Sequence, residues 1–149
     1  MKTHCILLLL LWCPISFADE VDCLALNIYH EAKNQSVTGK YAVAETTMNR
    51  VRDKRWPSTV CGVVKQQHRG VCQFSWYCDG KSDKPKIHNI IEKEQWIISI
   101  QIAEAVLNYG QIAVTNGALW YHSVKVKPYW ANVYRQTVQI EDHIFYKEN

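Results

Sequence analysis

Residues 23–35 read CLALNIYHEAKNQ, and they carry the strongest periodicity near the start of the chain. Apolar residues at four-residue steps, from Leu24 to Ala32, predict a helix over residues 21–33 with one buried face. Glu31 then falls in the last turn of that helix. The negative end of the helix dipole raises the pKa of a carboxyl placed there, which is the direction that a proton donor needs.

Three further helices are predicted from spacing. They cover residues 40–53, where a stripe runs from Tyr41 to Val51; residues 59–67, after the break WPS; and residues 90–109, which Gly110 ends. Residues 68–89 have no period and predict an ordered loop, with a short strand possible in CQFSW.

The last third of the chain changes in character. Asn116-Gly117 predicts a turn, ALWYH at 118–122 predicts a strand, and TVQIEDHIFYK at 137–147 predicts a strand or hairpin. We therefore expect one α+β domain, mainly helical, with a small β-hairpin or sheet element.

Residues 1–18, MKTHCILLLLLWCPISFA, have the organisation of a secretory signal peptide: a Lys, a short apolar run and small residues at the cleavage site. The apolar run is shorter than the ~20 residues of a spanning helix. An uncleaved N-terminal anchor is the alternative. We expect one domain over residues 19–149 that is secreted across the inner membrane to the periplasm or the exterior, with no stable membrane anchor after cleavage.

Charge and cysteine content fit an exported domain. The whole chain has a net charge of +3, too small to suggest a nucleic-acid partner. Beyond the signal lie four cysteines, an even number in an oxidising compartment, which predicts two disulfides. Of the three possible pairings we favour Cys61–Cys72 and Cys23–Cys78.

His30-Glu31 resembles the start of the zinc motif H-E-x-x-H. That motif needs a second His one helical turn later, and Asn34 stands there instead. We expect no metal and no cofactor.

A raised-pKa Glu31 suits cleavage of a glycosidic bond. Ordinary hydrolysis needs a second carboxylate, and Glu45 and Asp79 are candidates without decisive spacing. One chemistry avoids the second acid: the 6-hydroxyl of muramic acid attacks its own anomeric carbon, and one Glu serves first as acid and then as base. On spacing alone, a lone Glu in a helix is usually structural. Ser75 lacks the Gly neighbours of a nucleophile elbow.

Five segments, in order, resemble one known family. They are CLALNIYHEAKNQ, GKYAVAETTMNRVRD, WPSTVCGVV, CQFSWYCDG, and ALWYHSVKVKPYWA with HIFYK. Together they span Cys23 to Lys147 and resemble the SleB/CwlJ cell wall hydrolases, which include spore-cortex-lytic enzymes. The resemblance implies a lysozyme-like fold that acts on peptidoglycan glycan strands, and the best-understood members are lytic transglycosylases.

The resemblance also implies residue roles. The family's Ile-Tyr-aromatic-Glu-Ala pattern places the catalytic role on Glu31. Substrate-binding roles, as cleft walls and sugar contacts, fall on two segments: Gln73, Phe74 and Ser75, and Tyr121 with His122. His122 could tune a neighbour's charge or simply pack. The pattern commonly has Arg-Gly after Glu-Ala, where this chain has Lys33-Asn34, which alters the local turn and any anionic contact.

We therefore expect a secreted, monomeric lytic transglycosylase that cleaves between N-acetylmuramic acid and N-acetylglucosamine. A hydrolytic muramidase and a non-catalytic peptidoglycan-binding domain are the alternatives, and a zinc amidase is a distant third.

Overall fold

The computed structural model describes residues 16–110 and 112–149, so most of the predicted signal peptide lies outside the described residues. The helices are α1 (Phe17–Ala32), α2 (Val37–Arg52), α3 (Val60–Val64) and α4 (Ile90–Tyr109), with 3-10 turns η1 (Ser75–Cys78) and η2 (Tyr129–Asn132). The strands are β1 (Gln67–His68), β2 (Val71–Cys72), β3 (Trp120–Ser123), β4 (Arg135–Ile140) and β5 (His143–Lys147).

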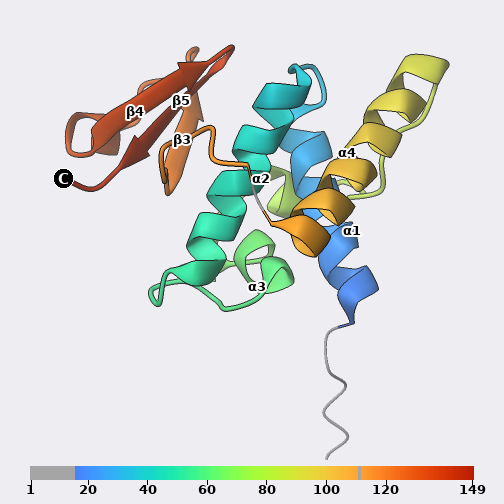
Figure 1. Cartoon of the computed structure of the whole chain (residues 1–149), viewed down its shortest axis with the longest axis horizontal. Coiled ribbons are helices and arrows are strands. Elements are labelled where there is room, and N and C mark those ends of the chain that lie inside the picture. Colours follow the sequence, from blue (N-terminus) through green and yellow to red (C-terminus); the bar gives the residue numbers. More distant parts are fainter. Residues whose placement is uncertain (1–15, 111) are drawn as a thin grey trace, which may run out of the picture.

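Helix α1 lies inside the helical part of the molecule, against α2, α3 and α4 (Figure 1). Its apolar stripe is fully buried, with Leu24, Ala25 and Ile28 at 0% exposure. Burying side chains of this size contributes about 1.5–3 kcal/mol each. The helix is therefore a rigid support for the residues in its last turn.

Helix α2 separates the helical layer from the sheet (Figure 1). Ala44 belongs to the core shared with α1 and α3, while Ala42 packs with Ala118 and Phe145 on the sheet side. Because two layers cover it, every residue from 42 to 47 is buried. The single stripe predicted from Tyr41 to Val51 was therefore too narrow.

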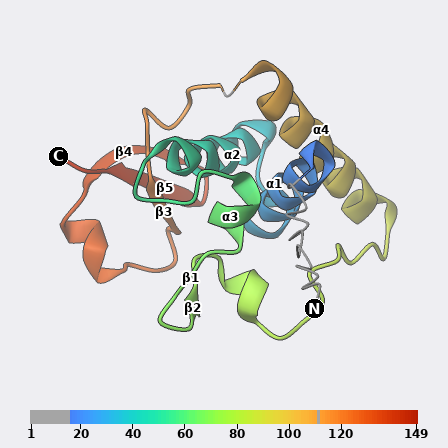
Figure 2. The same cartoon turned by 90° about the horizontal axis from the view of Figure 1, so that it is seen from below.

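The main sheet has the antiparallel order β3-β5-β4, with β4 and β5 joined as a hairpin. This confirms the hairpin predicted for residues 137–147. The shorter pair β1–β2 lies near α3, on the side seen in Figure 2. The prediction of a mainly helical α+β domain is also confirmed.

The disulfide pairing favoured from the sequence is wrong. The structure pairs Cys23 with Cys61, with the Cα atoms 5.2 Å apart, and Cys72 with Cys78. The reason lies in the packing: α1 contacts α3, so Cys23 meets Cys61 across two helices, whereas Cys72 and Cys78 lie at the two ends of one short loop.

Among the described helices, none combines the length and apolar character needed to cross a bilayer.

Candidate active site

Glu31 lies in the last turn of α1, where three elements meet. Its Oε2 accepts a hydrogen bond of 3.0 Å from the Tyr121 hydroxyl of β3. From α2 comes Arg50, which is only 2% exposed. The Arg50 Nε donates to the carbonyl of Leu119 at 2.7 Å, and its guanidinium lies 5.4 Å from the Phe74 ring centroid.

Burial raises the pKa of Glu31, while the Tyr121 hydrogen bond and the Arg50 charge act in the opposite direction. The shift has the direction predicted from the sequence, and burial is its largest cause. Burial also raises the pKa of Tyr121 well above its usual value, so the phenol stays protonated and donates to Glu31. Arg50 has a pKa lowered by burial to about 10 and remains a cation near neutrality.

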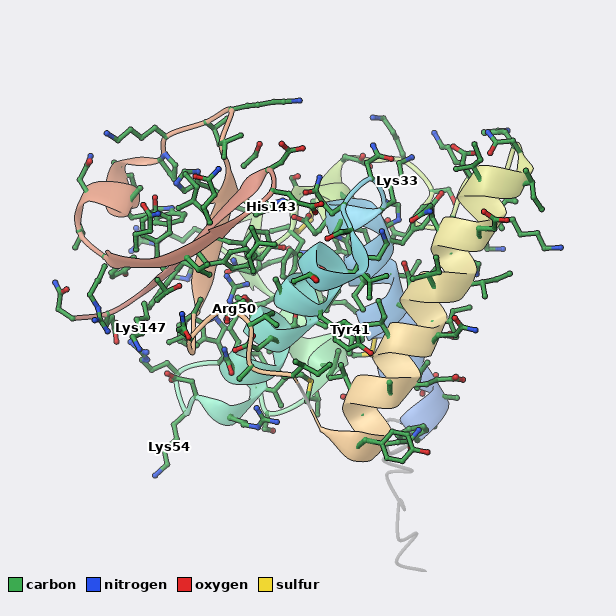
Figure 3. The ribbon with its side chains drawn as sticks, turned by 45° about the horizontal axis from the view of Figure 1, so that its top comes forward. Lys33, Tyr41, Arg50, Lys54, His143 and Lys147 are labelled. Atoms are coloured by element: carbon green, nitrogen blue, oxygen red, sulfur yellow. A yellow bond between two sulfur atoms is a disulfide. The ribbon has the colours of Figure 1, made fainter. Side chains whose placement is uncertain are left out.

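A groove of about 290 Å³ opens beside Glu31. Its walls come from the end of α1 with the loop that follows, and from the sheet: His30, Glu31, Lys33, Asn34, Gln35, Ser123, Lys125, Asp142 and His143. Figure 3 shows Lys33 and His143 at the same end of the molecule, one on each wall. The carboxyl is thus shielded by protein and still borders a space that a substrate can enter.

Buried Lys40 fixes the loop wall of this groove. Its Nζ donates to the carbonyls of Lys33 at 3.1 Å and Gln35 at 2.5 Å. Gln35 in turn bonds Asp142 twice, through its amide nitrogen to the carboxylate at 3.1 Å and through its amide oxygen to the backbone N–H at 3.2 Å. These contacts join the two walls across the groove.

The structure does not bring all of the predicted substrate-binding residues to Glu31. Phe74 is buried beneath Arg50, so its contribution to the site is support. Gln73 and Ser75 are exposed; Gln73 lines a separate hollow beside Trp56. Neither of them lines the groove at Glu31.

Tyr121 and His122 face opposite sides of the sheet, as adjacent strand residues must. Tyr121 points to Glu31, whereas the His122 ring stacks on Tyr146 at 5.3 Å and its Nε2 lies 3.0 Å from the Tyr146 hydroxyl. His122 therefore packs in an aromatic cluster on the other side of the sheet from Tyr121, and a role for it in sugar binding stays a prediction.

The carboxylates proposed as second acids lie elsewhere. The Glu45 Oε2 accepts the backbone N–H groups of Val114 at 2.6 Å and Thr115 at 2.7 Å, which makes it structural. Asp79 pairs with Lys81 at 3.6 Å, outside the groove at Glu31.

Two groove residues, Asp142 and His143, were missed in the sequence. Asp142 sits in the turn of the β4–β5 hairpin, and His143 is buried with its ring edge-on to Tyr121 at 5.3 Å. Within the described residues, the His143 Nδ1 has no hydrogen-bond partner. Only the alternation of His143 with buried Phe145 on one strand could have indicated that it faces inward.

His30 uses its ring for packing. The imidazole stacks on Trp76 at 4.5 Å, and its Nε2 lies 2.9 Å from the carbonyl of Asp83. This arrangement differs from the helix-face pair of a zinc protease.

A mainly helical domain with one shielded carboxyl bordering a groove defines the class of lysozyme-like enzymes that cleave glycans. The Cell Wall Hydrolase family matches residues 34–146, and the chain belongs to that family. It is an enzyme that acts on peptidoglycan, and the predicted lysozyme-like fold is confirmed.

Two solved structures are similar to this chain. The catalytic domain of the Bacillus cereus SleB protein is 26% identical, with 90% of this chain and 94% of that chain covered and a TM-score of 0.58. The catalytic domain of the germination-specific lytic transglycosylase SleB from Bacillus anthracis is 25% identical, with 86% and 93% covered and a TM-score of 0.60. No curated protein matches the chain.

Proposed function

We propose that this protein is a secreted lytic transglycosylase that cleaves peptidoglycan between N-acetylmuramic acid and N-acetylglucosamine, with Glu31 as its acid and then its base. The observation that carries the proposal is the environment of Glu31: a carboxyl whose pKa burial raises, bordering a groove on one side and bonded to Tyr121 on the other. The solved Bacillus anthracis relative is described as a lytic transglycosylase, which supports the same reaction here.

The reaction needs two proton transfers at one carboxyl, one from Glu31 and one back to it. Protonated Glu31 gives its proton to the bridging oxygen, and the bond from that oxygen to the muramic acid anomeric carbon breaks. The 6-hydroxyl of the same sugar then bonds to that carbon, and its proton passes to the Glu31 carboxylate. The product is a 1,6-anhydro sugar, no water is consumed, and the acid is restored.

Tyr121 and Arg50 stabilise the intermediate state of this cycle. Once Glu31 has lost its proton, a buried carboxylate remains and is costly without partners. The Tyr121 hydroxyl supplies a hydrogen bond at 3.0 Å and Arg50 supplies a nearby positive charge. Both favour the carboxylate, so the acid can release its proton inside a shielded site.

The test is digestion of purified peptidoglycan followed by mass spectrometry of the soluble fragments. We expect 1,6-anhydromuramic acid ends, which are about 18 Da lighter than reducing ends because no water has been added across the cleaved bond. Glu31→Gln should release no fragments. Full activity in Glu31→Gln would remove this residue from the mechanism.

A hydrolytic muramidase is the second candidate, and one observation favours it. Asp142 lines the same groove as Glu31 and is exposed, so it could activate a water molecule. Reducing muramic acid ends that disappear in Asp142→Asn would establish this mechanism. Anhydro ends that persist in Asp142→Asn would leave the transglycosylase assignment in place.

A further inference from the structure

We propose that a lysine-rimmed pocket next to the Glu31 groove binds a carboxylate carried by the muramic acid residue of the substrate. The inference rests on the proposed function, because it assumes that a glycan strand occupies the groove. The pocket would be a specificity site that recognises the anionic substituent of the sugar.

The pocket has a volume of about 260 Å³ and adjoins the groove. His30 and Lys33 line both spaces, and Glu31 lies between them in the chain. A sugar whose anomeric carbon is at Glu31 can therefore extend a substituent into the pocket without leaving the groove.

The floor of the pocket is aromatic and held in place. Trp76 stacks under His30 at 4.5 Å and donates from its indole nitrogen to Asn27 at 3.2 Å. The hydroxyl of Tyr29 donates to the carbonyl of Lys86 at 3.3 Å, which ties the loop wall to α1. A site fixed before binding loses less entropy when it binds its ligand.

The rim is strongly positive. Four lysines and one acid line the pocket: Lys33, Lys81, Lys84, Lys86 and Asp79. Their charges sum to +3, equal to the formal charge of the whole chain. The pocket lining therefore carries a local excess of positive charge.

Within the described residues, two of the four lysines already lie near a carboxylate, and the other two do not. Lys81 is 3.6 Å from Asp79, and Lys33 is 3.9 Å from Glu92. Over the described ranges 16–110 and 112–149, neither Lys84 nor Lys86 forms an ion pair. Both side chains are exposed at the rim of the pocket, where an ammonium group can donate charge-assisted hydrogen bonds to a carboxylate.

The carboxylate has two possible sources. Muramic acid carries a lactyl group, which presents its own carboxylate when unsubstituted and the carboxylates of a stem peptide when substituted. Both present the same anionic chemistry at the same position on the sugar, and the substrates below distinguish them.

The test compares Lys84→Gln/Lys86→Gln with Lys54→Gln/Lys65→Gln, a double variant of equal charge change. Lys54 lies at the opposite end of the molecule from Lys33 (Figure 3), and Lys65 lies outside the pocket. Initial rates are measured on glycan strands that carry stem peptides, on strands stripped of peptide to free lactyl groups, and on strands whose carboxyls are blocked as neutral amides.

We expect the first variant to raise KM roughly fivefold on peptide-bearing strands, with kcat unchanged and the difference shrinking at high salt. The control should leave KM unchanged. The effect should vanish on blocked strands. If the effect also appears on stripped strands, the pocket accepts the free lactyl carboxylate as well, and if it is lost there, the stem peptide alone supplies the ligand.

An equal change in both variants, or an unchanged KM effect on blocked strands, would overturn the proposal. Failure of the proposed reaction would look different. Hydrolytic products leave the KM comparison intact. If no cleavage occurs, sedimentation of both double variants with the three kinds of strand measures the same discrimination as binding.

Discussion

At the scale of single residues, the proposed mechanism depends on a balance of interactions around one carboxyl, that of Glu31. Burial raises the pKa of Glu31, and Tyr121 and Arg50 partly offset this effect. A carboxyl with no such partners would hold its proton too firmly, and one open to water would lose it at low pH.

Replacing Glu31 with Gln should reduce kcat by at least about 100-fold, because no group remains to transfer the proton. In the wild-type chain, activity should fall as the pH rises through the raised pKa of Glu31, at a midpoint above its ordinary 4.5. Rates over a pH series check both points. A midpoint at or below 4.5 would contradict the shielded-acid account.

The same shift has a consequence for stability. The folded state holds the Glu31 proton more tightly than the unfolded state does, so its stabilising effect is complete below pH 4.5 and is lost as the pH rises through the folded-state pKa. Glu31→Gln should therefore become more stable relative to wild type over that rise. Urea unfolding of both proteins on each side of it measures the difference.

Tyr121→Phe should lower kcat about tenfold, because the carboxylate formed after proton transfer loses a hydrogen bond to a charged group. It should also move the alkaline limb of the pH profile upward, since that hydrogen bond lowers the pKa of Glu31. Tyr146→Phe is the matched control, because it removes a hydroxyl bonded to His122 on the other face. A kcat loss in Tyr121→Phe without movement of the limb would indicate a merely structural role.

At the scale of elements, side chains of α2 hold the backbone of residues 114–119, the segment that leads into β3 and so brings Tyr121 to Glu31. Glu45 accepts the N–H groups of Val114 and Thr115, and Arg50 donates to the carbonyl of Leu119. Asn49, one turn after Glu45, donates to the carbonyl of Ala118 at 2.9 Å. The backbone before Tyr121 is thus fixed by polar side chains from a single helix.

Glu45→Ala should destabilise the fold by about 2–5 kcal/mol, because one buried and one partly buried N–H group lose their acceptor and a cavity forms. Glu45→Gln should cost less, because its amide oxygen can still accept. Denaturant unfolding measures both changes. Equal stability of Glu45→Ala and wild type would show that the connection is held by its own packing.

Local patterns predicted most of the elements, and they failed where the answer depended on contacts between distant segments. The stripe from Leu24 to Ala32 marked α1, although the helix begins at Phe17 and not at residue 21, and the bounds 90–109 of α4 were right. The burial of Glu45 was not visible, because its partners lie about seventy residues later. Spacing placed Glu31 on a helix, but its partner Tyr121 followed only from tertiary structure.

At the scale of the whole molecule, the two disulfides constrain very different lengths of chain. Cys23 and Cys61 are 38 residues apart, whereas Cys72 and Cys78 are 6 apart. Loop-closure entropy predicts a larger stabilisation from the longer loop.

Removing the first bridge as Cys23→Ala/Cys61→Ala should lower the free energy of unfolding by about 4 kcal/mol, against about 2 kcal/mol for Cys72→Ala/Cys78→Ala. Unfolding in urea without reductant tests the comparison, and comparable losses from both pairs would contradict it. Since Cys23 is more than two turns before Glu31 on α1, cleavage by the folded fraction should persist in both variants.

The hydrogen bond between residues 31 and 121 spans ninety positions. Glu31 is synthesised early, but the strands that shield its carboxyl from water are added near the end of the chain. A partly synthesised or truncated chain would leave this carboxyl hydrated and ionised, unable to attack the polymer. Cleavage activity should therefore appear only after the C-terminal strands have docked on the helices.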